Sequence, residues 1–146
     1  MTNPTFARTW ETSPRAGSDV YLVKDATTLY AGELVATDAN GLLDHWNGAT
    51  AALRFCGVLQ QTVTGDTSAG TVGIVDTSGA TLKHVAVTGG AQATVNSLVY
   101  SADGNIATGL TTSATTAGAI GILKFYRSAS DCDVELFTPA EHEAKL

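Results

Sequence analysis

Residues 33–46 read ELVATDANGLLDHW, two apolar runs separated by the pair Asn40-Gly41. Asn and Gly adopt positive φ angles at little cost, and a type I′ turn requires such angles at both of its central residues. The stretch therefore predicts a β-hairpin in which residues 33–38 pair with residues 42–46 in antiparallel order.

Similar patterns continue on both sides of this hairpin. Further strands are predicted at residues 20–24, 53–61, 71–76, 80–88, 98–100, 119–127 and 132–137. Ser78-Gly79 and Asp103-Gly104 are two more hairpin signals, and Gly57 within a strand predicts a bulge or a close backbone approach. Many short strands joined by Gly-rich turns indicate an all-β sandwich or barrel.

The two ends of the chain depart from the strand pattern. Residues 139–146, PAEHEAKL, begin with proline and continue with helix-forming residues, which predicts a short C-terminal helix. Residues 1–18, MTNPTFARTWETSPRAGS, hold two of the three prolines and have a net charge of +1, whereas the other 128 residues carry −7. We interpret residues 1–18 as an extended arm and residues 19–146 as a single β-rich domain.

The arm contains isolated large aromatic residues. No apolar pattern surrounds Phe6 or Trp10, whereas Phe55, Phe125 and Tyr126 fall inside apolar runs and are expected in the core. One interpretation is a disordered tail with incidental aromatic residues. The other is that the arm becomes ordered on a partner and inserts Phe6 and Trp10 into its surface.

Composition and charge argue against several classes of function. A net charge of −6 disfavours direct binding to nucleic acid, which requires a cationic surface. The sequence has no apolar run of about 18 residues to span a membrane and no secretory signal. Cys56 and Cys132 lie in apolar runs and are expected to be buried thiols rather than a disulfide.

The sequence also lacks a catalytic or metal-binding constellation. His45, His84 and His142 are 39 and 58 residues apart, and no nucleophile lies in a recognisable catalytic motif. Asp131 and Asp133 could face an ion together, but a solvated acidic strand face is the commoner arrangement. We therefore expect no enzyme activity, no cofactor and no metal.

Six motifs follow one another in an order that resembles a known family. They are Ala31-Gly32-Glu33-Leu34-Val35 with Asp38 and Gly41, Phe55-Cys56-Gly57-Val58, Thr64-Gly65-Asp66 with Ala69-Gly70, Leu98-Val99-Tyr100 with Asp103-Gly104, residues 118–123 (GAIGIL), and Val134-Glu135-Leu136. In order and spacing, over about residues 20–137, they resemble the capsid decoration (cement) proteins of tailed bacteriophages, similar to the lambda-type head decoration proteins.

This resemblance implies a small antiparallel β-barrel or β-tulip domain with an N-terminal arm. It also implies a homotrimer on the exterior of the virion capsid, at three-fold and quasi-three-fold positions, that stabilises the head against the pressure of packaged DNA. The partner would be the major capsid protein. The capsid contacts of the arm would be Phe6, Arg8, Trp10 and Arg15.

An alternative is a virion-surface module that binds carbohydrate or another host structure. Carbohydrate sites commonly combine an exposed aromatic ring with Asp or Asn side chains. Trp46 with Asp44 and Asn47 is the candidate group for such a site.

Overall fold

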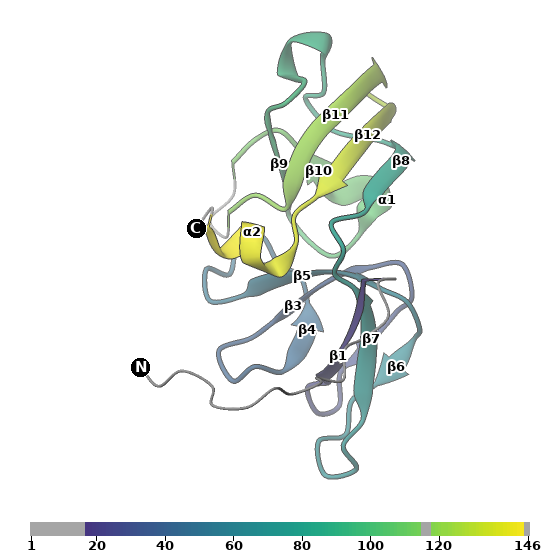
Figure 1. The fold of residues 1–146 in the computed structure, drawn as a ribbon, viewed down its shortest axis with the longest axis vertical. Coiled ribbons are helices and arrows are strands. Elements are labelled where there is room, and N and C mark those ends of the chain that lie inside the picture. The colour runs from purple at the N-terminus through teal and green to yellow at the C-terminus, as the bar shows by residue number, and fades with distance from the viewer. Residues whose placement is uncertain (1–16, 115–117, 145–146) are drawn as a thin grey trace, which may run out of the picture.

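Antiparallel β structure dominates the protein. The computed structural model describes residues 17–114 and 118–144, which form two five-stranded sheets and a two-stranded ribbon (Figure 1). This confirms the all-β prediction. Neither five-stranded sheet closes through a continuous ladder of paired strands within the described residues, so the barrel that the resemblance implies is not confirmed. Single bridges, Val23–Leu43 and Thr88–Thr111, link the two outer sides of each sheet near the strand ends.

Each sheet draws mainly on one half of the chain. The first sheet runs in the order β1 (Ser18–Leu22), β7 (Val72–Asp76), β5 (Arg54–Leu59), β3 (Leu34–Thr37) and β4 (Leu43–His45). The second runs in the order β10 (Leu110–Thr111), β9 (Leu98–Ser101), β11 (Gly121–Ser128), β12 (Asp131–Leu136) and β8 (Thr81–Val85). The ribbon pairs β2 (Thr28–Leu29) with β6 (Val63–Thr64).

Short helical segments complete the described part of the chain. They are the 3₁₀ helix η1 (Gln92–Thr94), the single turn α1 (Ile106–Gly109) and the C-terminal helix α2 (Pro139–Ala144). The predicted C-terminal helix is therefore confirmed. Figure 1 shows α2 at the level where the two sheets meet.

The first sheet is buried on both faces near its centre. Leu34 and Ala36 of β3 belong to a core that also contains Val99, Leu123 and other residues of the second sheet. Val35, between them, points to a separate core on the other side. This is why β3 is apolar without alternation, since a strand covered on both faces has no polar side.

The hairpin predicted at residues 33–46 is present, with a different turn. β3 pairs with β4 so that Thr37 lies opposite Leu43. The N–H of Gly41 donates to the Asp38 carbonyl at 3.0 Å, and within this loop Gly41 alone takes a positive φ, of 76°. The loop is thus a longer turn with one left-handed glycine, and the predicted type I′ turn is wrong because Asn40 keeps a negative φ.

Ser78-Gly79 does not form the predicted hairpin. β7, which precedes it, pairs with β1 and β5, and β8, which follows it, pairs with β12 in the other sheet. The turn therefore carries the chain from the first sheet to the second. Both edges of β7 are occupied by strands distant in sequence, so a local turn signal could not reveal its partners.

Candidate functional site

A groove of about 1000 Å³ opens where the two sheets meet. The first sheet and its loops contribute residues 30–33 and 45–47, and the second contributes residues 84–86, 103–107 and 130. A volume of this size lies at the upper end of the range for small-molecule sites in proteins, about 300–1000 Å³.

Glu33 organises one wall of the groove. Its carboxylate accepts a hydrogen bond from the Tyr30 backbone N–H at 2.6 Å and lies 2.6 Å from His45 Nδ1. The opposite segment approaches closely, because the Leu34 N–H donates to the Gly104 carbonyl at 2.9 Å. A Cβ at position 104 would lie 2.9 Å from both Glu33 Oε2 and the Leu34 carbonyl, so the position requires glycine.

Asp103-Gly104 therefore serves this contact rather than a two-residue hairpin. β9 and β10 do pair, with Ser101 opposite Leu110, but residues 102–109 and the turn α1 separate them. The Asp103 side chain accepts from the Asn105 N–H at 2.8 Å, and Asn105 caps α1 through the Ala107 N–H at 3.0 Å. The predicted hairpin turn is wrong, although the strands on either side are neighbours.

Trp46 forms the buried base of the groove. It is 1% exposed, and its Nε1–H donates to the Ser101 carbonyl at 2.9 Å. Its ring meets Phe55 and His142 edge to face, with centroids 5.6 and 5.5 Å away. Trp46 therefore joins the sheets and offers no exposed platform for a sugar.

The two polar residues grouped with Trp46 also have structural roles. Asp44 forms an ion pair with Lys24 at 3.2 Å. The Asn47 side chain accepts a hydrogen bond from the Ala49 N–H at 2.9 Å. The three residues predicted as a carbohydrate site do not present one together.

Tyr30 is the exposed aromatic side chain of the groove, and it was not among the predicted site residues. It is 61% exposed and lies in the turn before Glu33. The signal that could have identified it is an aromatic residue within a turn, because a turn offers little apolar surface to cover it. Phe125, which was expected in the core, is 54% exposed instead, and the Arg127 guanidinium stacks on its ring at 4.8 Å.

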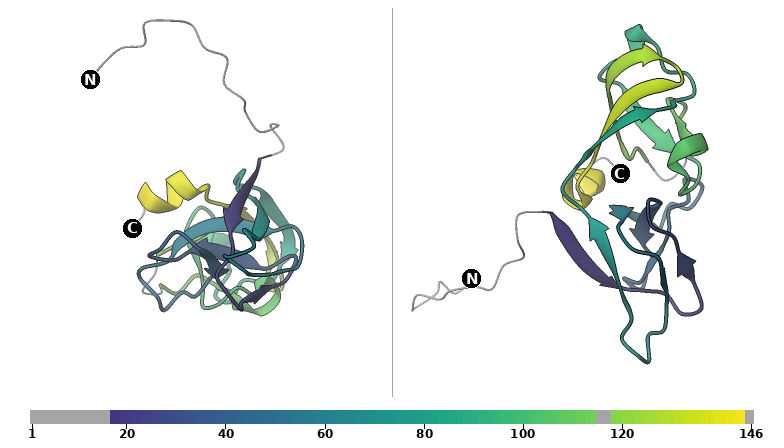
Figure 2. Two further views of the ribbon diagram at one scale, coloured as in Figure 1. Left: turned by 90° about the horizontal axis from the view of Figure 1, so that it is seen from below. Right: turned by 90° about the vertical axis from the view of Figure 1, so that its right-hand side faces the viewer.

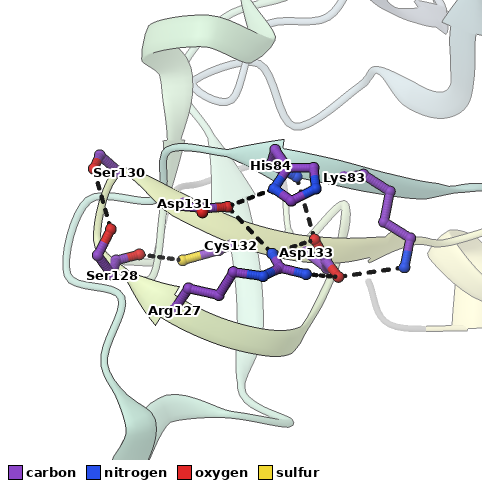
Figure 3. A network of polar contacts seen from close by, with 8 residues as sticks. All are labelled: Lys83, His84, Arg127, Ser128, Ser130, Asp131, Cys132 and Asp133. Atoms are coloured by element: carbon purple, nitrogen blue, oxygen red, sulfur yellow. Dashed lines mark hydrogen bonds and ion pairs between the residues drawn. The ribbon is translucent and has the colours of Figure 1, made fainter.

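A network of charged residues adjoins the groove on the second sheet (Figure 3). Arg127 forms two hydrogen bonds with Asp133, at 2.9 and 3.1 Å, and Lys83 lies 3.3 Å from the same carboxylate. Asp133 is 4% exposed, so the solvated acidic face expected here is wrong for this residue. The Arg127 guanidinium holds the pKa of Asp133 well below its usual range.

His84 connects this network to the groove. Its ring Nδ1 lies 2.9 Å from Asp131, and its backbone N–H donates to Asp133 at 3.2 Å. His84 has a φ of +57°, an unfavourable backbone conformation for a residue other than glycine. The paired carboxylates fix both the backbone and the ring of His84 in place.

The cysteines are free and buried, as predicted. Burial raises the pKa of the Cys56 thiol and, in the same way, that of Cys132. Because the thiolate is the reactive form, neither side chain is suited to act as a nucleophile at neutral pH.

The predicted arm contacts Phe6, Arg8, Trp10 and Arg15 lie outside the described residues. The structure does show where the arm enters the fold, since β1 begins at Ser18 and is an edge strand of the first sheet (Figure 2). Val20 and Val72 on neighbouring strands are 63% and 46% exposed. Their cross-strand partners Ile74 and Leu22 lie on the same face, so four aliphatic side chains form an apolar patch beside the free edge of β1.

Within residues 17–114 and 118–144, no three His, Cys, Asp or Glu side chains cluster as metal ligands would. In the same part of the chain, no helix is long and apolar enough to cross a membrane. Comparison of the chain with family models, with curated proteins and with solved structures found no match.

Proposed function

We propose that the protein is a capsid decoration (cement) protein of a tailed bacteriophage. In this proposal it adopts the β-barrel or β-tulip arrangement of that family, and a homotrimer binds the outside of the head at three-fold and quasi-three-fold positions. There it stabilises the head against the pressure of packaged DNA. The ordered motifs of residues 20–137 support the family assignment.

The observation that carries the proposal is the position of β1. One edge of β1 pairs with β7, and no described strand pairs with the other edge along Ser18–Leu22. β4 meets the chain only beyond the end of β1, where Val23 forms a single bridge with Leu43. The predicted arm, residues 1–18, ends at the first residue of this strand, so the arm and the free edge are continuous in sequence. An exposed edge can accept a strand from a partner, with main-chain hydrogen bonds supplying affinity and side chains fixing the register.

The apolar patch beside β1 is a second reason to assign the partner contact to this edge of the sheet. Val20, Leu22, Val72 and Ile74 lie on the face of the first sheet that carries Val58, and Val58 packs into the core between the sheets. The second sheet covers this face at β5 and β3 but leaves Val20 and Val72 exposed. A contiguous apolar surface next to an open edge is typical of a protein–protein contact.

Co-sedimentation with purified phage heads that lack the decoration protein tests the proposal. The full chain should sediment with the heads, and both residues 17–146 and the variant Val20→Lys should bind more weakly. Thr81→Lys is the matched control, because Thr81 is an exposed residue of similar size on β8, the edge strand of the other sheet. If Val20→Lys binds as well as the unmodified chain, β1 is not part of the capsid contact. If the unmodified chain does not bind to the heads, the proposed function is rejected.

A further inference from the structure

We propose that the groove between the two sheets is a binding site for a neutral saccharide. This inference is independent of the capsid function, because it rests on the groove and can be tested on the free protein. It replaces the group of Trp46, Asp44 and Asn47 with a different set of residues.

The groove provides an aromatic surface. Tyr30 is 61% exposed, and none of the hydrogen bonds described for residues 17–114 and 118–144 involves its hydroxyl. A tyrosine ring offers an apolar face and a polar tip at a small entropic cost on binding. Those properties suit a sugar ring, which presents C–H groups on its faces and hydroxyls at its rim.

Two histidines provide directed polar groups. His45 and His84 both line the groove, and each directs Nδ1 at a carboxylate, of Glu33 at 2.6 Å and of Asp131 at 2.9 Å. Because an ionised carboxylate only accepts hydrogen bonds, Nδ1 carries the proton in each ring. In the neutral imidazole Nε2 is then an acceptor, available to a ligand hydroxyl.

The charge of the lining selects among saccharides. Glu33 and Asp103 contribute carboxylates, and no lysine or arginine is among the lining residues in the described part of the chain. An acidic surface repels sialylated, sulfated or phosphorylated sugars. The geometry therefore favours a ligand without negative charge.

The site is also held in advance of binding. Glu33 is fixed by the Tyr30 N–H, Trp46 by the Ser101 carbonyl, and His84 by two carboxylates in a left-handed conformation. Preorganised groups lose little freedom when a ligand binds, which favours affinity. Residues other than glycine that have a positive φ often occur at functional sites, and His84 is such a residue in the lining of the groove.

The test is an array of immobilised neutral oligosaccharides with their sialylated counterparts, probed with the full chain. We expect the chain to bind neutral glycans in preference to the sialylated ones. For the strongest neutral glycan, calorimetry should show about tenfold or more weaker affinity for Tyr30→Ala and retained affinity for Tyr30→Trp. His84→Asn, which tolerates a positive φ, should also weaken binding.

Phe125→Ala is the matched control, because Phe125 is an exposed aromatic residue, 54% accessible, that does not line the groove. It should bind as the unmodified chain does. All variants are first checked for an unchanged urea midpoint, which is expected for Tyr30 because its side chain is exposed. The proposal is overturned if no neutral glycan binds, if sialylated glycans bind better, or if Tyr30→Ala binds as well as the unmodified chain.

Discussion

At the scale of single residues, Gly57 shows how the absence of a side chain can allow two strands to meet. Val35 lies opposite Gly57 and Ala36 opposite Phe55, so Cys56 is the extra residue of a bulge in β5. Gly57 has a φ of +150°, and a Cβ there would overlap the Asp76 carbonyl oxygen of β7. The sequence predicted this bulge and close approach, because an isolated glycine in an apolar strand has few other causes.

Gly57→Ala should therefore destabilise the protein more than Gly41→Ala. Position 41 also has a positive φ, but a Cβ added there would meet no other atom within 4 Å, so alanine should cost only the backbone strain, about 1–2 kcal/mol. At position 57 the clash must also push β5 away from β7. Urea unfolding of the two variants measures the difference, and equal free energies of unfolding would contradict this account.

Asp133 gives the protein an acid-sensitive contribution to stability. Its pKa is lowered in the folded state, chiefly by the hydrogen bonds of Arg127, so the stabilisation is present above the unfolded pKa of about 3.9 and is lost as the pH falls toward the folded value. Asp133→Asn should lower the urea midpoint at pH 7, and the gap to the unmodified chain should narrow below about pH 4.

Asp131→Asn is the control for this prediction. The Asp131 side chain is 38% exposed, so its pairing with Arg127 and His84 is screened by solvent and should matter less. A gap between Asp133→Asn and the unmodified chain that stays constant from pH 7 to about pH 2 would mean that the Asp133 carboxylate does not carry the effect.

At the scale of elements, α2 links the end of the chain to the core. Thr138 and Glu141 form a capping box, with the Thr138 N–H donating to Glu141 at 2.9 Å and the Glu141 N–H donating to Thr138 at 3.2 Å. Next along the helix, the buried His142 accepts a hydrogen bond from the Phe55 N–H at 3.2 Å. The cap therefore fixes the helix that delivers His142 to β5.

His142→Ala should destabilise the fold by about 1–3 kcal/mol or more, because it leaves the buried Phe55 N–H without this acceptor and removes a ring packed on Trp46. Glu143→Ala tests the same helix without that contact. Glu143 is half exposed and lies 3.7 Å from Arg54, so its loss should cost less than about 1 kcal/mol. Thermal unfolding of both variants measures the difference in stability. A similar loss of stability for each would mean that His142 stabilises the helix and that its contacts with Phe55 and Trp46 add nothing further.

Elements defined by local chemistry were predictable, and those defined by distant partners were not. The hairpin of residues 33–46 and the helix of residues 139–144 follow from turn, proline and apolar patterns within a few residues. The separation of β7 from β8 does not, because β1 and β5 occupy the edges of β7. The groove was missed for the same reason, since residues 30–33 and 103–107 meet only through tertiary packing.

At the scale of the whole molecule, one shared core joins the two sheets. Leu34 and Phe55 of the first sheet pack with Val99 and Leu123 of the second, and Trp46 bonds across to Ser101. The free edge of β1 lies outside this core. β4, β8 and β10 are also outer strands of their sheets, and the exposed apolar patch beside β1 is what distinguishes the edge at β1 as a surface suited to assembly.

Light scattering of the full chain and of residues 17–146 tests the assembly. The proposed function predicts a trimer, with a mass near three times 15.0 kDa, that persists after truncation because the arm is assigned to the capsid rather than to the trimer contact. The truncated protein should also keep its urea midpoint, since the proposal assigns the arm to the capsid contact rather than to the core of the domain. If truncation abolishes the trimer, the arm takes part in the contact between copies of the chain. If the full chain is a monomer, the prediction of a trimer is wrong.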